Sequence, residues 1–242
     1  AVGFAVRPSH SGAGIGRVVD RIPVPTPGGP FVGRLTFGAG SLWIRKSGDD
    51  QVLRIDPATG RTIARIKVGF AYDTDIAVQD GDVWVTNGED GTVSRIDAAT
   101  NSVGATIRVG SYPLGIAATD NAVWVANHHS GSVSRIDPRT NRVVSTVPIS
   151  LASNFSGPLH LVLAKHQLWV EDATDGAVVR VDPLRNRRTG AILQSGPACG
   201  GMTADGDSVW VASGCDESTV TRIDAKTARV VRVIELPGVA FD

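Results

Sequence analysis

The chain has 242 residues, and its 24 Lys and Arg residues balance its 24 Asp and Glu residues, so the net charge is near zero. Proteins that bind nucleic acids normally carry a basic excess that neutralises phosphates, so we expect no nucleic-acid partner. Hydrophobic residues make up 42% of the chain, which is enough for a packed core and excludes general disorder. The longest apolar runs have only the length of a strand, so we expect no membrane span.

A phrase of about forty residues recurs along the chain, and this period is typical of a repeat architecture. Each phrase opens at a tryptophan and ends in Arg-Ile-Asp or Arg-Val-Asp, as in VWVANHHSGSVSRID. The tryptophans are Trp43, Trp84, Trp124, Trp169 and Trp210, and the matching arginines are Arg54, Arg95, Arg135, Arg180 and Arg222. We therefore predict repeating units over about 31–70, 71–110, 111–150, 157–195 and 197–236.

Each unit has the pattern of four short β-strands. In the third unit, alternating and β-branched segments predict strands over 114–119, 122–126, 132–136 and 142–149, with a first turn at Asp120–Asn121. No stretch of the chain shows a helical period. Four antiparallel strands every 40 to 45 residues are typical of one blade of a β-propeller. We expect the tryptophans to pack between neighbouring blades, the arginines to pair between blades, and the Asp of each Arg-Ile-Asp to cap a turn.

The two ends of the chain match one further unit. Joined in circular order, VAFD from the C-terminus and AVGFAV–RPSHSGAGI–GRVVDRIPV from the N-terminus follow the pattern of the third repeat. We therefore predict a single-domain, six-bladed propeller whose sixth blade is split between about 237–242 and 1–25, which closes the ring and removes open edges. Five blades with a spare N-terminal strand are the competing interpretation.

The repeats resemble two known groups of proteins. VWVANHHSGSVSRIDPRTNRVVSTVPI resembles the YVTN-type repeat of bacterial propellers, which implies architecture over nearly the whole chain. The order of Gly-Pro, inner strand, Leu-Trp-Val and Arg-Val-Asp also resembles the streptogramin B (virginiamycin B) lyases. Proteins of that family have seven blades. The resemblance implies a magnesium-dependent enzyme that opens a cyclic depsipeptide ester by elimination, with His and Glu residues near the channel mouth. The repeat GPLHLVLAKHQLWVEDATDG approaches this pattern with His160 and Asp172, and the Glu-x-His pairing of the family is missing.

Cys199 and Cys215 are the only cysteines. They lie at the start of one predicted strand and just past the end of the strand that pairs with it, so a disulfide is geometrically reasonable. Two buried or free thiols are the alternative. A disulfide implies an oxidising compartment, so we predict a secreted or cell-surface protein.

Candidate site residues come from comparing equivalent places around the ring, because the chain contains no linear catalytic motif. The innermost strand of each blade begins at the mouth of the central channel, nine residues before each tryptophan. The residues at that place are Arg34, Asp75, Gly115, His160 and Gly201. The residues three places after each tryptophan are Lys46, Asn87, Asn127, Asp172 and Ser213. If the disulfide forms, the register pairs Arg34 with Lys46, Asp75 with Asn87 and His160 with Asp172. The Asp-Gly and Asp-Asn turns of the second and third repeats would shift this register by one residue, so it is defined only to within one position.

Loops on the same predicted face add further polar and aromatic residues, whereas His166 is expected in a turn on the opposite face. The loop residues are His10, Tyr72, Glu89, Asp90, Tyr112, His128, His129 and Glu171.

Three functions fit this set of residues. In the first, the mouth binds a small polar or anionic ligand through Arg34, Lys46, Asp75, Asn87, Tyr112, Asn127, His129 and Glu171. In the second, His160 and Asp172 hold a divalent ion such as Mg²⁺ or Ca²⁺, and His160 or His128 removes a proton in a lyase or hydrolase that opens a cyclic ester or lactone. In the third, the propeller is a rigid platform for a protein partner. In each case we expect a monomer.

Overall fold

The computed structural model describes residues 33–72, 75–150, 157–174, 176–193, 200–213 and 219–236. These residues form twenty β-strands in five sheets, and each sheet holds four antiparallel strands that follow one another along the chain. The prediction of an all-β chain with four strands in each repeat is therefore confirmed. In the described part of the chain, no helix has the length and hydropathy to cross a membrane.

The sheets are numbered in chain order. Sheet 1 contains β1 (Leu35–Gly38), β2 (Ser41–Arg45), β3 (Asp49–Ile55) and β4 (Thr62–Ala71). Sheet 2 contains β5 (Ile76–Gln79), β6 (Asp82–Asn87), β7 (Thr92–Asp97) and β8 (Ser102–Arg108). Sheet 3 contains β9 (Pro113–Thr119), β10 (Ala122–Asn127), β11 (Ser132–Asp137) and β12 (Arg142–Pro148). Sheet 4 contains β13 (Pro158–Ala164), β14 (Gln167–Asp172), β15 (Ala177–Asp182) and β16 (Arg187–Leu193). Sheet 5 contains β17 (Gly201–Ala204), β18 (Ser208–Ser213), β19 (Thr219–Asp224) and β20 (Arg229–Glu235).

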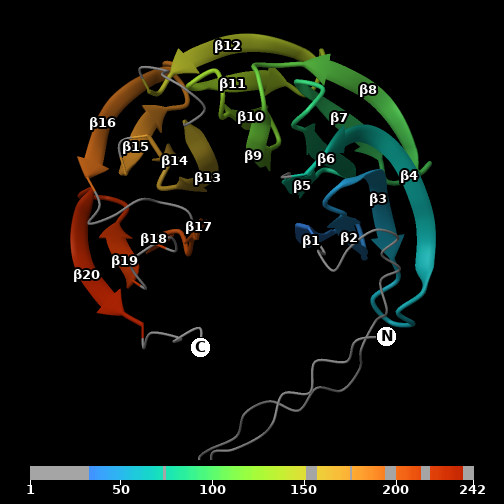
Figure 1. Ribbon diagram of the computed structural model, residues 1–242, viewed down its shortest axis with the longest axis horizontal. Coiled ribbons are helices and arrows are strands. Elements are labelled where there is room, and N and C mark those ends of the chain that lie inside the picture. The colour runs from blue at the N-terminus through green and yellow to red at the C-terminus, as the bar shows by residue number, and fades with distance from the viewer. Residues whose placement is uncertain are drawn as a thin grey trace, which may run out of the picture.

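The five sheets stand around a central space like blades, as Figure 1 shows. The first strand of each sheet (β1, β5, β9, β13 and β17) lies innermost, and the fourth strand lies outermost. Sheets 1 to 5 form an arc, and no described strand fills the space between sheet 5 and sheet 1. The predicted sixth blade falls on residues 1–25 and 237–242, which lie outside the described residues.

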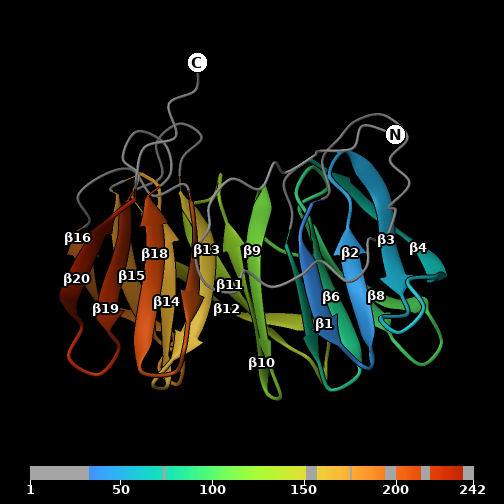
Figure 2. The same ribbon diagram turned by 90° about the horizontal axis from the view of Figure 1, so that it is seen from below.

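Turns and loops gather on two opposite faces of the arc, which Figure 2 shows from the side. The inner strands begin on one face, which we call the channel-mouth face, and the loops from each second strand to each third strand lie there too. The tight turns between first and second strands and between third and fourth strands lie on the opposite face. The strands alone therefore place the start of every inner strand around one opening.

Each sheet is held to the next by a tryptophan on its second strand. Trp43, Trp84, Trp124 and Trp169 are at most 1% exposed, and each packs against apolar residues of the following sheet. Trp43, for example, shares a cluster with Ile76, Val83 and Val85 of sheet 2. Aromatic side chains of this size bury the largest apolar area of any residue, so they dominate the contact between sheets. The expected packing of the tryptophans between blades is thus confirmed for these four residues.

The two ends of the arc depart from this pattern. Leu35 of sheet 1 is 62% exposed, whereas its equivalents Ile76, Ile116 and Leu161 are each 5% exposed. Trp210 of sheet 5 is partly exposed, unlike the other four tryptophans. Within the described residues, Leu35 has no preceding sheet to pack against and Trp210 has no following sheet.

The aspartates of the Arg-Ile/Val-Asp elements cap turns as predicted, and two of the arginines, Arg54 and Arg95, bond to the next sheet. In every sheet the arginine guanidinium lies 5.0–5.9 Å from the ring centroid of the tryptophan of its own sheet, a cation–π distance. Arg95 also reaches the next sheet and donates to the carbonyl oxygen of Pro138 (2.6 Å) and to Oδ1 of Asn141 (2.9 Å). The aspartates cap their turns, as when Asp97 accepts from the backbone N–H of Ala99 at 2.7 Å.

Candidate functional site

Tight turns set the register of the inner hairpins that carry the site. In sheets 1, 2 and 4 the turns are Ala39–Gly40, Asp80–Gly81 and Lys165–His166, and both residues of each turn have a positive φ. Two-residue turns of this kind match the twist of antiparallel strands. Pairing therefore starts directly beside the turn, at Gly38–Ser41, Gln79–Asp82 and Ala164–Gln167.

The structure shifts the register at the channel mouth by one residue, which is the margin that the sequence left open. The sequence predicted the pairs Arg34–Lys46, Asp75–Asn87 and His160–Asp172. The structure instead places Arg34 opposite Arg45, Asp75 opposite Thr86 and His160 beside Glu171. Because side chains alternate between the two faces of a strand, a shift of one residue exchanges every partner across the hairpin. The two-residue turns, in sheets 1 and 4 as well as in sheet 2, cause this shift.

Three charged or titratable side chains from opposite sides of the channel meet at the mouth. Nη2 of Arg34, just before β1, lies 2.5 Å from Nε2 of His160 on β13. Nδ1 of the same imidazole lies 2.6 Å from Oε2 of Glu171 on β14. Figure 1 shows β1 and β13 on opposite sides of the central space, so this contact crosses the channel.

The contacts of His160 define its tautomer. A guanidinium can only donate hydrogen bonds, so Nε2 of His160 accepts from Arg34. The proton of the neutral ring is then on Nδ1, which donates to Glu171. Glu171 is fully buried and His160 is 18% exposed, so a buried carboxylate fixes the orientation of a ring whose other nitrogen faces the channel.

Asp75 adds a buried carboxyl group to the cluster. Burial raises the pKa of Asp75, while hydrogen bonds from the backbone N–H groups of Ile76 and Ile116 and the charge of Arg34 act in the opposite direction. The bond to Ile116 (3.2 Å) ties sheet 2 to sheet 3 at the channel. The structure thus brings together Arg34, Asp75 and His160, which are three of the five residues that lie nine positions before a repeating tryptophan.

Local backbone irregularities make room for this arrangement. β13 carries one extra residue between Pro158 and Leu161 relative to β14, and such bulges redirect side chains next to functional sites. Gly115 holds the equivalent place in sheet 3, where a Cβ atom would lie 2.4 Å from the carbonyl oxygen of Leu159. Only glycine therefore fits beside His160 at this position.

Three predicted ligand-binding residues are instead buried within the protein. The Lys46 amine is 4% exposed and pairs with Asp49 in its own hairpin. Asn87 is fully buried and donates to Oγ1 of Thr92 and Oγ of Ser94. Asn127 is buried in the same way and donates to Ser132 and Ser134. These side chains hold the second and third strands of their sheets together.

The aromatic residues of the loops form a cluster of their own. The ring of Tyr112 stacks on His129 at 4.2 Å between centroids, and His128 lies 5.3 Å from His129. Burial lowers the pKa of His129, the charge of His128 adds to this effect, and Glu89 opposes it. Nδ1 of His128 is buried without a hydrogen-bond partner.

The pair His160 and Asp172 does not fit a divalent ion. Asp172 follows Glu171 on β14, so the two side chains point to opposite faces of the sheet. Both ring nitrogens of His160 are already engaged, by Glu171 and by Arg34. Among the described residues, no group of three or more His, Cys, Asp or Glu side chains is arranged to hold a metal ion.

The remaining predicted residues lie elsewhere. Tyr72 is 60% exposed and packs edge-on against Phe70, and Asp90 accepts from the backbone N–H of Phe70. His166 is exposed in its turn on the opposite face, as expected. Cys199, Cys215 and His10 lie outside the described residues. The role of Glu171 as the partner of His160 was missed, because the Lys165–His166 turn carries no sequence signal that would have fixed the register.

Comparisons with known proteins identify the fold. No family model matches the chain, and no curated protein matches it. Similar solved structures include hydrazine synthase of Kuenenia stuttgartiensis, with 19% identity and a TM-score of 0.70 over 88% of this chain and 70% of that chain. They also include a catalytically inactive histidine-to-alanine variant of virginiamycin B lyase from Staphylococcus aureus with quinupristin. This structure has 18% identity and a TM-score of 0.71 over 86% of this chain and 70% of that chain. The fold is that of a β-propeller. Likeness at this level of identity extends to the fold alone.

The raised pKa of Asp75 predicts a pH dependence of stability. Between the ordinary pKa of Asp, about 3.9, and the raised pKa, the folded protein binds more protons at this site than the unfolded chain does. The contribution of Asp75 to the unfolding free energy therefore falls as pH rises through that window. Relative to Asp75→Asn, the wild type should lose stability across the window in urea titrations, and Arg34→Ala should enlarge this loss.

Asp97→Asn is the matched control, because backbone hydrogen bonds from Thr100 and Ala99 lower the pKa of Asp97. Relative to this variant, the wild type should lose stability as pH falls, which is the opposite sign. Parallel profiles for the wild type and Asp75→Asn would contradict the assignment at Asp75.

Proposed function

We propose that this propeller binds a small anionic or strongly polar molecule at the mouth of its central channel, through Arg34 and His160. The observation that carries the proposal is the cross-channel contact between these side chains, with His160 held in place by buried Glu171. A purely structural ring needs no guanidinium across its opening. This contact supports the proposal of a binding site over that of a purely structural role.

The chemistry of the cluster favours an anion. Arg34 is exposed, and its contact with His160 uses only one of its five N–H donors. The remaining donors have the geometry that binds a carboxylate or phosphate through two parallel hydrogen bonds. Asp75 contributes a carboxyl group that a hydroxyl of the same ligand can contact.

Binding can be tested by thermal unfolding in the presence of acetate, succinate and phosphate. An anion at a hundred times its dissociation constant should stabilise the protein by about 2.7 kcal/mol, and Arg34→Ala and His160→Ala should each remove this gain. Arg61→Ala, which removes an exposed arginine on the opposite face, is the control and should keep it. Equal stabilisation of the wild type and both site variants, or none at all, would favour a platform for a protein partner instead.

The His160–Glu171 pair supports a second candidate function, proton removal in a lyase or hydrolase that acts on a cyclic ester. A histidine oriented by a buried carboxylate is a common general base. Nε2 of His160 reaches a substrate once Arg34 moves from its nitrogen to a carbonyl or carboxylate oxygen. The likeness to virginiamycin B lyase, of which an inactive histidine variant was solved with quinupristin, makes cyclic depsipeptides the first substrates to test.

Catalysis predicts a particular pattern of kinetic effects with quinupristin and simple lactones. His160→Ala should abolish turnover, and Glu171→Gln should reduce kcat about 10²–10⁴-fold, the range of general-base contributions, with a smaller change in KM. Arg34→Lys should retain more activity than Arg34→Ala. No turnover by the wild type, with or without added Mg²⁺ or Ca²⁺, would leave binding as the function.

We also propose that the ring closes with a sixth blade built from 237–242 and 1–25. The exposed Leu35 and the partly exposed Trp210 support this proposal, because their equivalents are covered wherever a neighbouring sheet is described. In the circular match of the ends, Phe4 takes the place of the repeating tryptophan. The competing five-bladed count leaves both residues without the contacts that their equivalents make.

Amide hydrogen exchange distinguishes a six-bladed ring from a five-bladed one. With a sixth blade, amides of residues 2–6 should exchange slowly, and Trp210→Ala should speed their exchange, while Trp124→Ala should act mainly on sheets 3 and 4. Exchange of residues 2–6 at the rate of an unstructured chain would contradict closure.

We further propose that the protein acts outside the cytoplasm, as a secreted or cell-surface chain. The two cysteines, with places that suit a Cys199–Cys215 disulfide, are the support for this location.

A further inference from the structure

A second site lies on the face opposite the channel mouth, in a groove between sheets 3 and 4. The groove has a volume of about 270 Å³. Its lining is largely apolar, and it contains one arginine and no Asp or Glu. The lining residues are Thr119, Asn121, Ala122, Trp124, Arg135, Leu163, His166, Pro183 and Leu184.

The repeat provides a reference for this groove. At the first two junctions the repeating arginine reaches the next sheet and donates to a turn carbonyl and to an Asn side chain. Arg54 donates to the carbonyl oxygen of Ala98 (2.5 Å) and to Oδ1 of Asn101 (2.8 Å). Arg95 makes the same two bonds with Pro138 and Asn141. The guanidinium therefore links one sheet to the next.

The third junction lacks this link although both partners are present. Arg135 is the repeating arginine, and Pro183 and Asn186 occupy the places of the two acceptors. Within the described part of the chain, Arg135 donates no hydrogen bond; its guanidinium lies 5.7 Å from the centroid of Trp124. Nε of Arg135 and Oδ1 of Asn186 are both buried without a hydrogen-bond partner. Buried polar atoms without partners are costly, so they call for an explanation.

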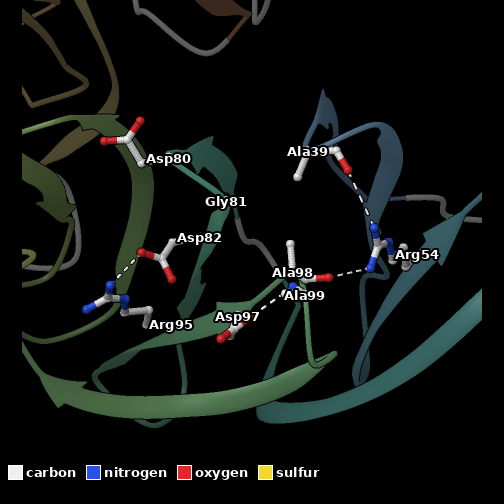
Figure 3. A pocket seen from close by; sticks show the side chains of 9 residues that line it. All are labelled: Ala39, Arg54, Asp80, Gly81, Asp82, Arg95, Asp97, Ala98 and Ala99. Atoms are coloured by element: carbon white, nitrogen blue, oxygen red, sulfur yellow. Dashed lines mark hydrogen bonds and ion pairs between the residues drawn. The ribbon is translucent and has the colours of Figure 1, made fainter.

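Figure 3 shows how differently the groove between sheets 1 and 2 is built. That groove, of about 520 Å³, is lined by Asp80, Asp82 and Asp97 as well as by two arginines. Its guanidinium groups are engaged, Arg54 by the carbonyl oxygen of Ala98 and Arg95 by the carboxylate of Asp82. A bound anion would meet three carboxylates there, which is an unfavourable charge.

We propose that the groove between sheets 3 and 4 binds a small amphipathic carboxylate. The carboxylate accepts hydrogen bonds from the guanidinium of Arg135. This group carries the positive charge of the groove, and its N–H donors have no partner within the described residues. The apolar part packs on Leu163, Pro183 and Leu184, and Leu184 is 86% exposed without a ligand. The nearest carboxylate of the turn, Asp182, already accepts from Leu184, Arg185 and the Arg185 side chain. The ligand thus supplies the partner that the repeat supplies at the first two junctions.

Phenylacetate is a suitable probe, because it joins one carboxylate to one apolar ring. In ¹H–¹⁵N spectra of the full chain, the Nε–H signal of Arg135 should shift and saturate with a dissociation constant on the order of 1 mM. Phenylacetamide, which lacks the charge, and acetate, which lacks the ring, should each bind at least about tenfold more weakly, because each loses one of the two contacts.

Matched variants separate this site from the channel mouth. Arg135→Gln should abolish the shifts that phenylacetate causes at the backbone amides of Leu163 and Leu184, whereas Arg54→Gln, which removes the engaged arginine of the first junction, and His160→Ala should leave the affinity measured at these amides unchanged. Thermal unfolding adds a second readout, because Arg135→Gln should cost less stability than Arg54→Gln if Arg135 is free.

Two results would overturn the proposal. The first is an Arg135 Nε–H signal that none of the three probes shifts. The second is a stability loss in Arg135→Gln as large as that in Arg54→Gln, which would mean that Arg135 is bonded to Asn186 in solution.

Discussion

The burial of one tryptophan per repeat beneath the following sheet is the contact on which the rest of this structure depends. Neighbouring sheets share no strand pairing within the described residues, so apolar packing and a few polar side-chain bonds hold them together. Truncating a buried tryptophan to alanine typically costs about 3–5 kcal/mol, which is a large share of the stability of a domain. Four copies of this contact fix the spacing and orientation of five sheets, and they thereby fix which residues face the central channel.

Repetition also explains why the site is visible as a departure from the pattern. Places that serve only packing carry the same kind of residue in every sheet, as the tryptophans and the turn-capping aspartates do. The place nine before each tryptophan instead holds Arg34, Asp75, Gly115, His160 and Gly201. Three of these converge on one opening, and the glycine of sheet 3 leaves the room that His160 needs. The fold supplies the equivalent places, and the variation among them supplies the chemistry.

The period of the tryptophans was sufficient to predict the class of fold, the four strands of each repeat and the residues that approach the channel. The partners across each hairpin could be predicted only to within one residue, because they depend on turn length. The turns at Ala39–Gly40 and Lys165–His166 carry no Asn-Gly or Asp-Gly signal, and two residues with positive φ in each shift the register by one. Because of this one-residue shift, Glu171 and not Asp172 lies beside His160, and Lys46 lies in the protein interior and not at the channel mouth. Side-chain burial at Asn87 and Asn127 likewise follows from packing that the linear pattern does not contain.

The central claim is that Arg34 and Glu171 hold opposite nitrogens of His160 across the channel, and the protonation of that ring tests it most directly. Long-range ¹H–¹⁵N spectra distinguish a protonated ring nitrogen from a bare one. The account predicts a neutral ring with its proton on Nδ1 and a bare Nε2, and it predicts that Arg34→Ala shifts the Nε2 signal more than the Nδ1 signal. A ring protonated on Nε2 and bare on Nδ1 cannot accept from Arg34 or donate to Glu171, so that result would contradict the account.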